Sequence, residues 1–170
     1  MNGSQTASLR LRLAEPGDVG RVVEIFNQGV EDRVATFETR PAGEADGARW
    51  ISEDLVMVAL RDGDLVAFAK AGPYADRHRY YDGVREATLY VERGARRTGV
   101  GSRLLDALAD AAAAAGAHKL VGKIFTSNAP SIALVESLGW REVGVHRRHG
   151  TLDGEWKDVM VVEKLLGPGG

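Results

Sequence analysis

The stretch Arg96-Arg97-Thr98-Gly99-Val100-Gly101 decides the fold of this chain, because it joins a strand pattern to a helix pattern. The strand pattern is Ala87-Thr88-Leu89-Tyr90-Val91, and the helix that follows has one apolar face: Val100, Leu104, Leu105, Leu108, Ala112 and Ala115. A strand, a glycine-rich turn and a helix N-terminus together present free backbone N–H groups and the positive end of a helix dipole. Both features favour phosphate, so the first hypothesis is a cofactor that carries a pyrophosphate.

The composition is that of an ordinary globular protein, and it excludes several functional classes. Hydrophobic residues make up 44% of the 170 residues and charged residues 27%, which is enough apolar surface for a core. A net charge of −2 argues against nucleic acid or an anionic membrane as a partner. The chain has no cysteine, so disulfides, a thiolate nucleophile and a cysteine-ligated metal are excluded. No apolar run is long enough to span a bilayer, and we expect a cytoplasmic protein.

The hydrophobic pattern predicts a mixed, mostly antiparallel sheet flanked by helices, an α/β (α+β) fold in one domain over residues 9–166. Leu9, Leu11 and Leu13 alternate with polar residues and predict a half-buried strand. Two apolar runs around Asp62-Gly63-Asp64 predict a hairpin. Helices are expected over residues 16–30, 42–53, 100–115 and 129–138, and later strands over residues 119–125, 141–149 and 156–164. The predicted order is β-α-α-β-β-β-α-β-α-β-β, with residues 1–8 and 167–170 as flexible ends.

Spacing distinguishes three kinds of glycine-rich phosphate loop. A Walker P-loop requires Lys and then Ser or Thr after its second glycine, whereas Val100 and Gly101 follow Gly99. A dinucleotide-binding fingerprint requires a third glycine where this chain has Leu104. The pattern that remains is Arg-x-x-Gly-x-Gly, which by itself is also compatible with a tight turn between a strand and a helix.

The hexapeptide Arg96 to Gly101 resembles the acetyl-CoA signature of the GCN5-related N-acetyltransferases (GNAT), Gln/Arg-x-x-Gly-x-Gly/Ala after the fourth strand. Residues 128–140, from Asn128-Ala-Pro-Ser to Leu-Gly-Trp140, are similar to the later motif of the same family. Two motifs in the right order and a matching element order extend the resemblance over nearly the whole chain. It implies acetyl-CoA as co-substrate and a homodimer.

Shorter segments resemble the phosphinothricin and methionine sulfoximine acetyltransferases within that family: residues 25–30, 35–39, 71–74, 149–150 and 156–159. Residues 27–39 most resemble the arsinothricin N-acetyltransferase branch. The resemblance implies acetylation of the α-amine of a glutamate-like amino acid whose side chain ends in a tetrahedral head. Such an activity serves detoxification.

The resemblance also implies where the cofactor binds. The pantetheine arm would add as an extra strand along Leu89, Tyr90 and Val91, where a backbone N–H polarises the thioester oxygen. The pyrophosphate would bind the loop residues Arg97, Thr98, Gly99, Val100, Gly101 and Ser102. Arg96, Arg97 or Arg103 would supply charge, unless these arginines form a solvated helix face. Asn128 and Ser131 complete the predicted cofactor site, and Asn128 is equally suited to cap the next helix.

Acetyl transfer to an amine requires a base, a polarised thioester and a proton for the leaving thiolate. Glu86 is the predicted general base, directly or through water, with an exposed strand-end carboxylate as the alternative. His149 matches a histidine of the phosphinothricin branch and can take or relay the amine proton. Val135 stands where many relatives carry the tyrosine that protonates the thiolate, which leaves Tyr90, a water or bulk solvent for that step.

No metal is expected. His146 and His149 look like a pair of ligands, but three residues apart on a strand they are predicted to point to opposite faces.

A carboxylate and a tetrahedral anionic head both call for cations and polar donors. Arg77 is the first candidate for substrate binding, and Arg85 and Thr88 beside Glu86 are the next. Asn27, Phe37 and Tyr74 are expected to line the same site, with core packing as the alternative for the two aromatic residues.

Two other functions remain open from the sequence. One is a GNAT enzyme that acetylates another amine, such as a protein N-terminus or a polyamine. The other is a non-catalytic acetyl-CoA-binding sensor.

Overall fold

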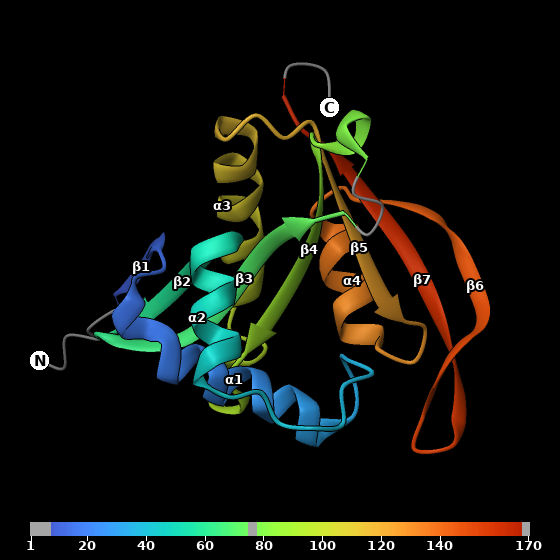
Figure 1. The fold of residues 1–170 in the computed structure, drawn as a ribbon, viewed down its shortest axis with the longest axis horizontal. Coiled ribbons are helices and arrows are strands. Elements are labelled where there is room, and N and C mark those ends of the chain that lie inside the picture. Colours follow the sequence, from blue (N-terminus) through green and yellow to red (C-terminus); the bar gives the residue numbers. More distant parts are fainter. Residues whose placement is uncertain (1–7, 75–77, 168–170) are drawn as a thin grey trace, which may run out of the picture.

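A seven-stranded sheet with the order β1-β2-β3-β4-β5-β7-β6 is the centre of the computed structural model, which describes residues 8–74 and 78–167 (Figure 1). The strands are β1 (Leu9–Leu13), β2 (Leu55–Arg61), β3 (Asp64–Pro73), β4 (Val84–Val91), β5 (Lys119–Phe125), β6 (Arg141–Leu152) and β7 (Glu155–Leu165). The α-helices are α1 (Val19–Asp32), α2 (Glu44–Glu53), α3 (Val100–Ala114) and α4 (Ala129–Ser137). Short 3-10 turns lie at Pro16–Asp18, Arg79–Tyr81 and Arg93–Ala95. The predicted fold class and element order are confirmed.

Helices cover both faces of the sheet and divide the apolar core into two parts. On the face covered by α1 and α2, here called the α1 face, Phe68 and Tyr90 pack against Phe26. On the other face, here called the α3 face, alanines of β3 and β4 meet the leucines of α3. These alanines let the helix approach the sheet closely. Because side chains alternate along a strand, Glu86, Thr88 and Tyr90 lie on the α1 face of β4.

The strands β4 and β5 are the parallel pair of this otherwise antiparallel sheet, and they pair only briefly. Their register runs from Val84 opposite Lys119 to Glu86 opposite Val121, after which the strands diverge (Figure 1). Each strand keeps its other partner, because β3 pairs with β4 as far as Val91 and β7 pairs with β5 as far as Phe125. Both strands therefore turn an unpaired edge toward the gap between them.

The structure departs from the sequence predictions at several element ends. Leu13 is 55% exposed rather than half-buried, and Ala115 is exposed because α3 ends one residue before it. The last hairpin is longer than predicted, since β6 continues to Leu152. Of the ends expected to be flexible, only Ser8 and Gly167 belong to the described residues, and Ser8 donates a hydrogen bond to Asp62. No helix in residues 8–74 and 78–167 is long and apolar enough to cross a membrane.

A pair of leucine truncations tests the placement of the core. Leu108 is fully buried against the α3 face, so Leu108→Ala should lower the free energy of unfolding by about 2–5 kcal/mol. Leu13→Ala removes the same atoms from a largely exposed side chain and should cost about 1 kcal/mol or less. Urea unfolding followed by circular dichroism measures both. An equal loss in the two variants would contradict this account of the core.

Candidate active site

A groove follows the gap between β4 and β5. Its outer section, of about 380 Å³, is lined by the phosphate-loop residues Arg96, Arg97, Gly99, Gly101 and Ser102 and by the edge of β4. Its inner section, of about 90 Å³, reaches Thr88, Lys123 and Trp140 between the diverging strands. Residues common to both sections are Ala35, Leu89, Tyr90, Asn128, Ser131 and Leu134. The two sections therefore form one continuous channel from the loop to the fork of the strands.

The phosphate loop offers a set of free backbone donors. No main-chain carbonyl of the described residues accepts a hydrogen bond from the N–H groups of residues 97–102. Gly99 has a φ of +81°, which favours glycine, and a Cβ at Gly101 would lie 3.2 Å from the Leu89 side chain. Thr98 faces the protein, because its hydroxyl donates to the Ala95 carbonyl at 2.5 Å. The loop can thus bind a pyrophosphate through main-chain N–H groups and the N-terminus of α3.

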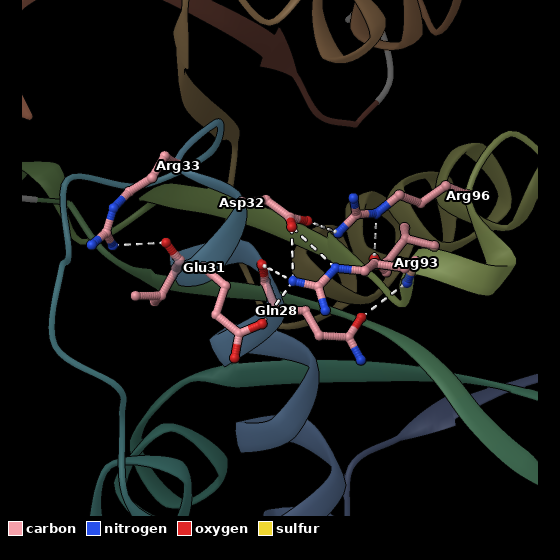
Figure 2. Close-up of polar contacts among 8 residues, drawn as sticks. Gln28, Glu31, Asp32, Arg33, Arg93 and Arg96 are labelled. Carbon is pink, nitrogen blue, oxygen red and sulfur yellow. Dashed lines mark hydrogen bonds and ion pairs between the residues drawn. The ribbon is translucent and has the colours of Figure 1, made fainter.

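Arg96 does not point its charge into the groove. Figure 2 shows its guanidinium beside Asp32, with Arg93 on the other side of the same carboxylate. The Arg96 Nη2 lies 2.7 Å from Asp32 Oδ2, and its Nε donates to the Val91 carbonyl at 3.0 Å. Hydrogen bonds from Arg93, and then those from Arg96, hold the pKa of Asp32 below its ordinary value against the effect of its burial. Arg97 lines the groove and has no ion pair within the described residues, so it can face a phosphate.

The edge of β4 that faces the gap carries the main-chain groups of Leu89 and Val91, of which the Val91 carbonyl accepts from Arg96 Nε. The Glu92 N–H donates to the Val66 carbonyl. In an antiparallel pair every second residue bonds to the partner strand, so Glu92, Tyr90 and Thr88 direct their main-chain groups toward β3. The N–H and C=O groups of the residues between them point toward the gap. An extended amide chain can add to this edge like a strand.

Tyr90 packs its ring into the α1-face core, stacked on Phe68 at 5.3 Å and edge-on to Phe26 at 5.0 Å. A Cβ at Gly29 would lie 2.9 Å from this ring, so glycine is required there. Burial raises the pKa of the Tyr90 hydroxyl to about 12. The hydroxyl therefore stays protonated at neutral pH.

Three polar groups lie where the inner section of the groove meets the fork. Glu86 occupies the last position of β4 that pairs with β5, and its Oε2 lies 3.0 Å from Lys123 Nζ. Thr88 comes next on the same face, and its Oγ1 is buried without a hydrogen-bond partner among the described residues. A carboxylate, an ammonium and an unused hydroxyl are thus gathered beside the channel.

The two histidines of β6 lie together, and the prediction that they point to opposite faces is wrong. Their rings stack at 4.4 Å with an interplanar angle of 16°. The cause is a bulge between His146 and Gly150, in which Arg148 has a φ of 49° and donates to Asp158 Oδ1. His146 also lines a hollow of about 380 Å³ together with Tyr74 and Lys123. Within residues 8–74 and 78–167 no group of three or more His, Cys, Asp or Glu residues could hold a metal ion.

Asn27 and Asn128 both use their side-chain amides to hold backbone groups. Asn27 uses both ends of its amide on Ala42, at 3.1 and 2.8 Å, and lines none of the three hollows described above. The side-chain oxygen of Asn128 accepts from the Ser131 N–H, which confirms its predicted role as a helix cap, and its nitrogen donates to the Val34 carbonyl. Asn128 nevertheless lines both sections of the groove.

The remaining predicted substrate residues are spread over the molecule. Phe37 packs edge-on to Phe125 at 4.7 Å and against Gly150, where a Cβ would lie 2.7 Å from its ring. The register places Arg85 on the α3 face with Leu120, on the opposite side of β4 from Glu86. The expectation that Arg85 lies beside Glu86 is therefore wrong for its side chain. Arg77 lies outside the described residues.

Lys123 and Asp32 are the residues that the sequence reasoning missed. Alternation along residues 119–125 places Lys123 on the same face of its strand as Val121 and Phe125. Its contact with Glu86 also requires that β5 lie beside β4, which the sequence pattern does not show. The contacts of Asp32 span 61 residues of sequence to Arg93, and no local pattern reveals them.

A model of the acetyltransferase (GNAT) family matches residues 23–140. The chain belongs to the GNAT family. It is an acetyl-CoA-dependent N-acetyltransferase.

Two known relatives are similar to this chain over nearly its whole length. A phosphinothricin N-acetyltransferase from Streptomyces viridochromogenes is 33% identical over 89% of this chain and 84% of its own. An L-methionine sulfoximine/L-methionine sulfone acetyltransferase from Salmonella typhimurium is 28% identical over 93% and 95% of the two chains.

Two solved structures have the same fold. A phosphinothricin acetyltransferase from Sinorhizobium meliloti in complex with acetyl-CoA has a TM-score of 0.87 and 30% identity, covering 94% of this chain and 89% of its own. A ribosomal-protein-alanine N-acetyltransferase from Brucella melitensis has a TM-score of 0.88 and 30% identity, covering 92% and 99%.

The lowered pKa of Asp32 predicts how the stability of the protein depends on pH. Because the pKa of Asp32 is depressed in the folded state, its stabilising contribution is fully present above the unfolded value, about 4, and is lost as the pH falls through the folded pKa. Asp32→Asn should therefore be less stable than the wild type near neutral pH, and the difference should shrink below about pH 4.

Urea unfolding across this pH range measures the effect. The control Asp110→Asn, at an exposed position of α3, should show no such dependence. A difference between Asp32→Asn and the wild type that stays constant with pH would contradict the assignment.

Proposed function

We propose that this enzyme acetylates the α-amine of a glutamate-like amino acid of the phosphinothricin or methionine sulfoximine type. The observation that carries the proposal is Glu86, a carboxylate at the fork of β4 and β5. It contacts Lys123, which lines both the cofactor groove and the pocket beside it. Full-length similarity to enzymes named for these two substrates supports it. The sequence of residues 27–39 supports arsinothricin as a third acceptor. A detoxifying role, a cytoplasmic location and a homodimer belong to the same proposal.

The groove fits acetyl-CoA. Residues 97–102 would hold the pyrophosphate through their free N–H groups, with Arg97 as the cation. The edge of β4 at Leu89 and Val91 would hold the pantetheine amides, and an N–H group of this edge would polarise the thioester oxygen. Ser131 and the cap residue Asn128 would close the groove on the opposite side. Bound acetyl-CoA supplies the activated acetyl group.

The chain's own residues would then prepare the acceptor. A free amino acid arrives as an ammonium ion, and Glu86 would take one proton from it, directly or through a water. Thr88 would use its unpartnered hydroxyl as a hydrogen-bond partner of the acceptor. Tyr74 and His146 border the pocket beside Lys123. His149, which stacks on His146, would relay the proton onward.

Tyr90 is a poor candidate for the acid that protonates the leaving thiolate. Its pKa of about 12 lies well above that of an ordinary thiol, about 8.5, so transfer of its proton would be uphill. Val135 at the usual tyrosine position supplies no proton either. We infer that the thiol gains its proton from solvent.

A second candidate acceptor is a protein N-terminus. The observation that favours it is the similarity to a structure named as a ribosomal-protein-alanine N-acetyltransferase at 30% identity.

A thiol-release assay separates the candidate acceptors. With acetyl-CoA present, we expect release of free thiol with phosphinothricin, methionine sulfoximine and arsinothricin, and little with an alanine-terminated peptide. Failure on all the amino acids combined with turnover on the peptide would overturn the proposal. Binding of acetyl-CoA without thiol release from any acceptor would instead indicate a sensor.

The role of Glu86 has its own test. Glu86→Gln removes the base and keeps the shape, so kcat should fall about 10²–10⁴-fold while the KM for acetyl-CoA changes little. The control Glu24→Gln, at a largely exposed position of α1, should behave like the wild type. A Glu86→Gln enzyme with more than half of the wild-type kcat would exclude Glu86 as the base.

A further inference from the structure

Lys123 occupies a singular position in this enzyme. Within the described residues it is the one residue that lines both the inner section of the cofactor groove and the pocket bordered by Tyr74 and His146. It is also the one lysine or arginine among those lining residues. A cation therefore stands where the acetyl donor and the acceptor amine must meet.

The neighbours of Lys123 in β5 make its position unusual. Side chains on the α1 face of this strand are Val121, Lys123 and Phe125, so the lysine interrupts an apolar row. The end of the Lys123 side chain reaches solvent from this row. Its partner is Glu86, at 3.0 Å.

Stability alone is a weak reason for this ion pair. The Lys123 and Glu86 side chains are 38% and 28% exposed, and pairs with this much solvent contribute little to folding. Since Glu86 is the base of the proposed reaction, the pair instead connects a cation to the reacting centre.

We propose that Lys123 binds the α-carboxylate of the acceptor while Glu86 receives its ammonium group. This inference rests on the proposed function and names the feature of the acceptor that the site selects. The amino nitrogen and a carboxylate oxygen of an α-amino acid are three bonds apart, at roughly 3 Å. Glu86 and Lys123 are neighbours, so the two side chains can reach both charges of one acceptor once their own contact opens. Binding exchanges one ion pair for two, so neither protein charge is left without a partner.

The exchange gives the enzyme a preference for free amino acids. An acceptor without a carboxylate leaves Lys123 attached to Glu86, so the base stays occupied. Other described cations near the fork have partners elsewhere: Lys70 pairs with Asp54 at 2.7 Å, and Arg85 lies on the α3 face. Lys123 is thus the described cation that is free to change partners.

A pair of acceptors that differ at the α-carboxyl group tests the proposal. Methionine sulfoximine and its α-carboxamide both present a primary α-amine, and kcat/KM is measured for both with saturating acetyl-CoA. Because the carboxamide has the less basic amine, each variant is compared with the wild type on the same acceptor. In Lys123→Met the value for the acid should fall about 10- to 100-fold, mainly through KM, as expected for loss of a hydrogen bond to a charged group. The value for the carboxamide should stay the same or rise, because the variant releases Glu86 from Lys123. Lys123→Arg should recover part of the activity on the acid.

The control is Lys119→Met, on the same strand, where the lysine pairs with Glu163 outside the site. It should retain the wild-type preference for the acid. An equal loss on both acceptors in Lys123→Met, or no loss on either, overturns the role of Lys123 and leaves the proposed function intact. A wild-type enzyme that acetylates a peptide and no amino acid overturns the proposed function, and this inference with it. An unchanged KM for acetyl-CoA shows that Lys123→Met is folded.

Discussion

The early end of the pairing between β4 and β5 is the constraint on which the rest of this structure depends. The strands separate after Glu86 and Val121 because β4 stays with β3 and β5 stays with β7. Val135 of α4 and Trp140 are buried behind the gap and fill its α3 side. The gap creates three things at once: a free strand edge, a channel along it, and a carboxylate at the point where the strands part. Binding and chemistry therefore share one structural origin.

Contacts between distant parts of the sequence fix the phosphate loop relative to this gap. Gln28 accepts from the Arg93 N–H at 2.9 Å, and Asp32 holds Arg93 and Arg96 from the end of α1 (Figure 2). The bond from Asn128 to Val34 attaches the segment after α1 to the start of α4. Arg96, which the sequence suggested as a cation for the cofactor, instead forms an ion pair with Asp32 that fixes the loop. This leaves Arg97 and the backbone N–H groups for the phosphates.

Sequence reasoning succeeded where the signal is local and failed where it depends on pairing between distant segments. The Arg96 to Gly101 turn, the order of the elements and the cap at Asn128 follow from patterns within a few residues. The stacking of His146 on His149 needs two extra residues in β6 relative to β7, which the assumption of regular alternation could not anticipate. The contact of Asn27 was also beyond a local pattern, because its partner Ala42 lies 15 residues away in a loop.

The most direct test of the central claim is amide hydrogen exchange, measured by NMR with and without coenzyme A. If the unpaired edge of β4 receives the pantetheine arm, exchange at Leu89 or Val91 and in residues 97–102 should slow when the ligand binds. Tyr90 serves as an internal reference, because its N–H faces β3 and should be protected in both states. Unchanged exchange along this edge, with protection appearing elsewhere, would contradict the account.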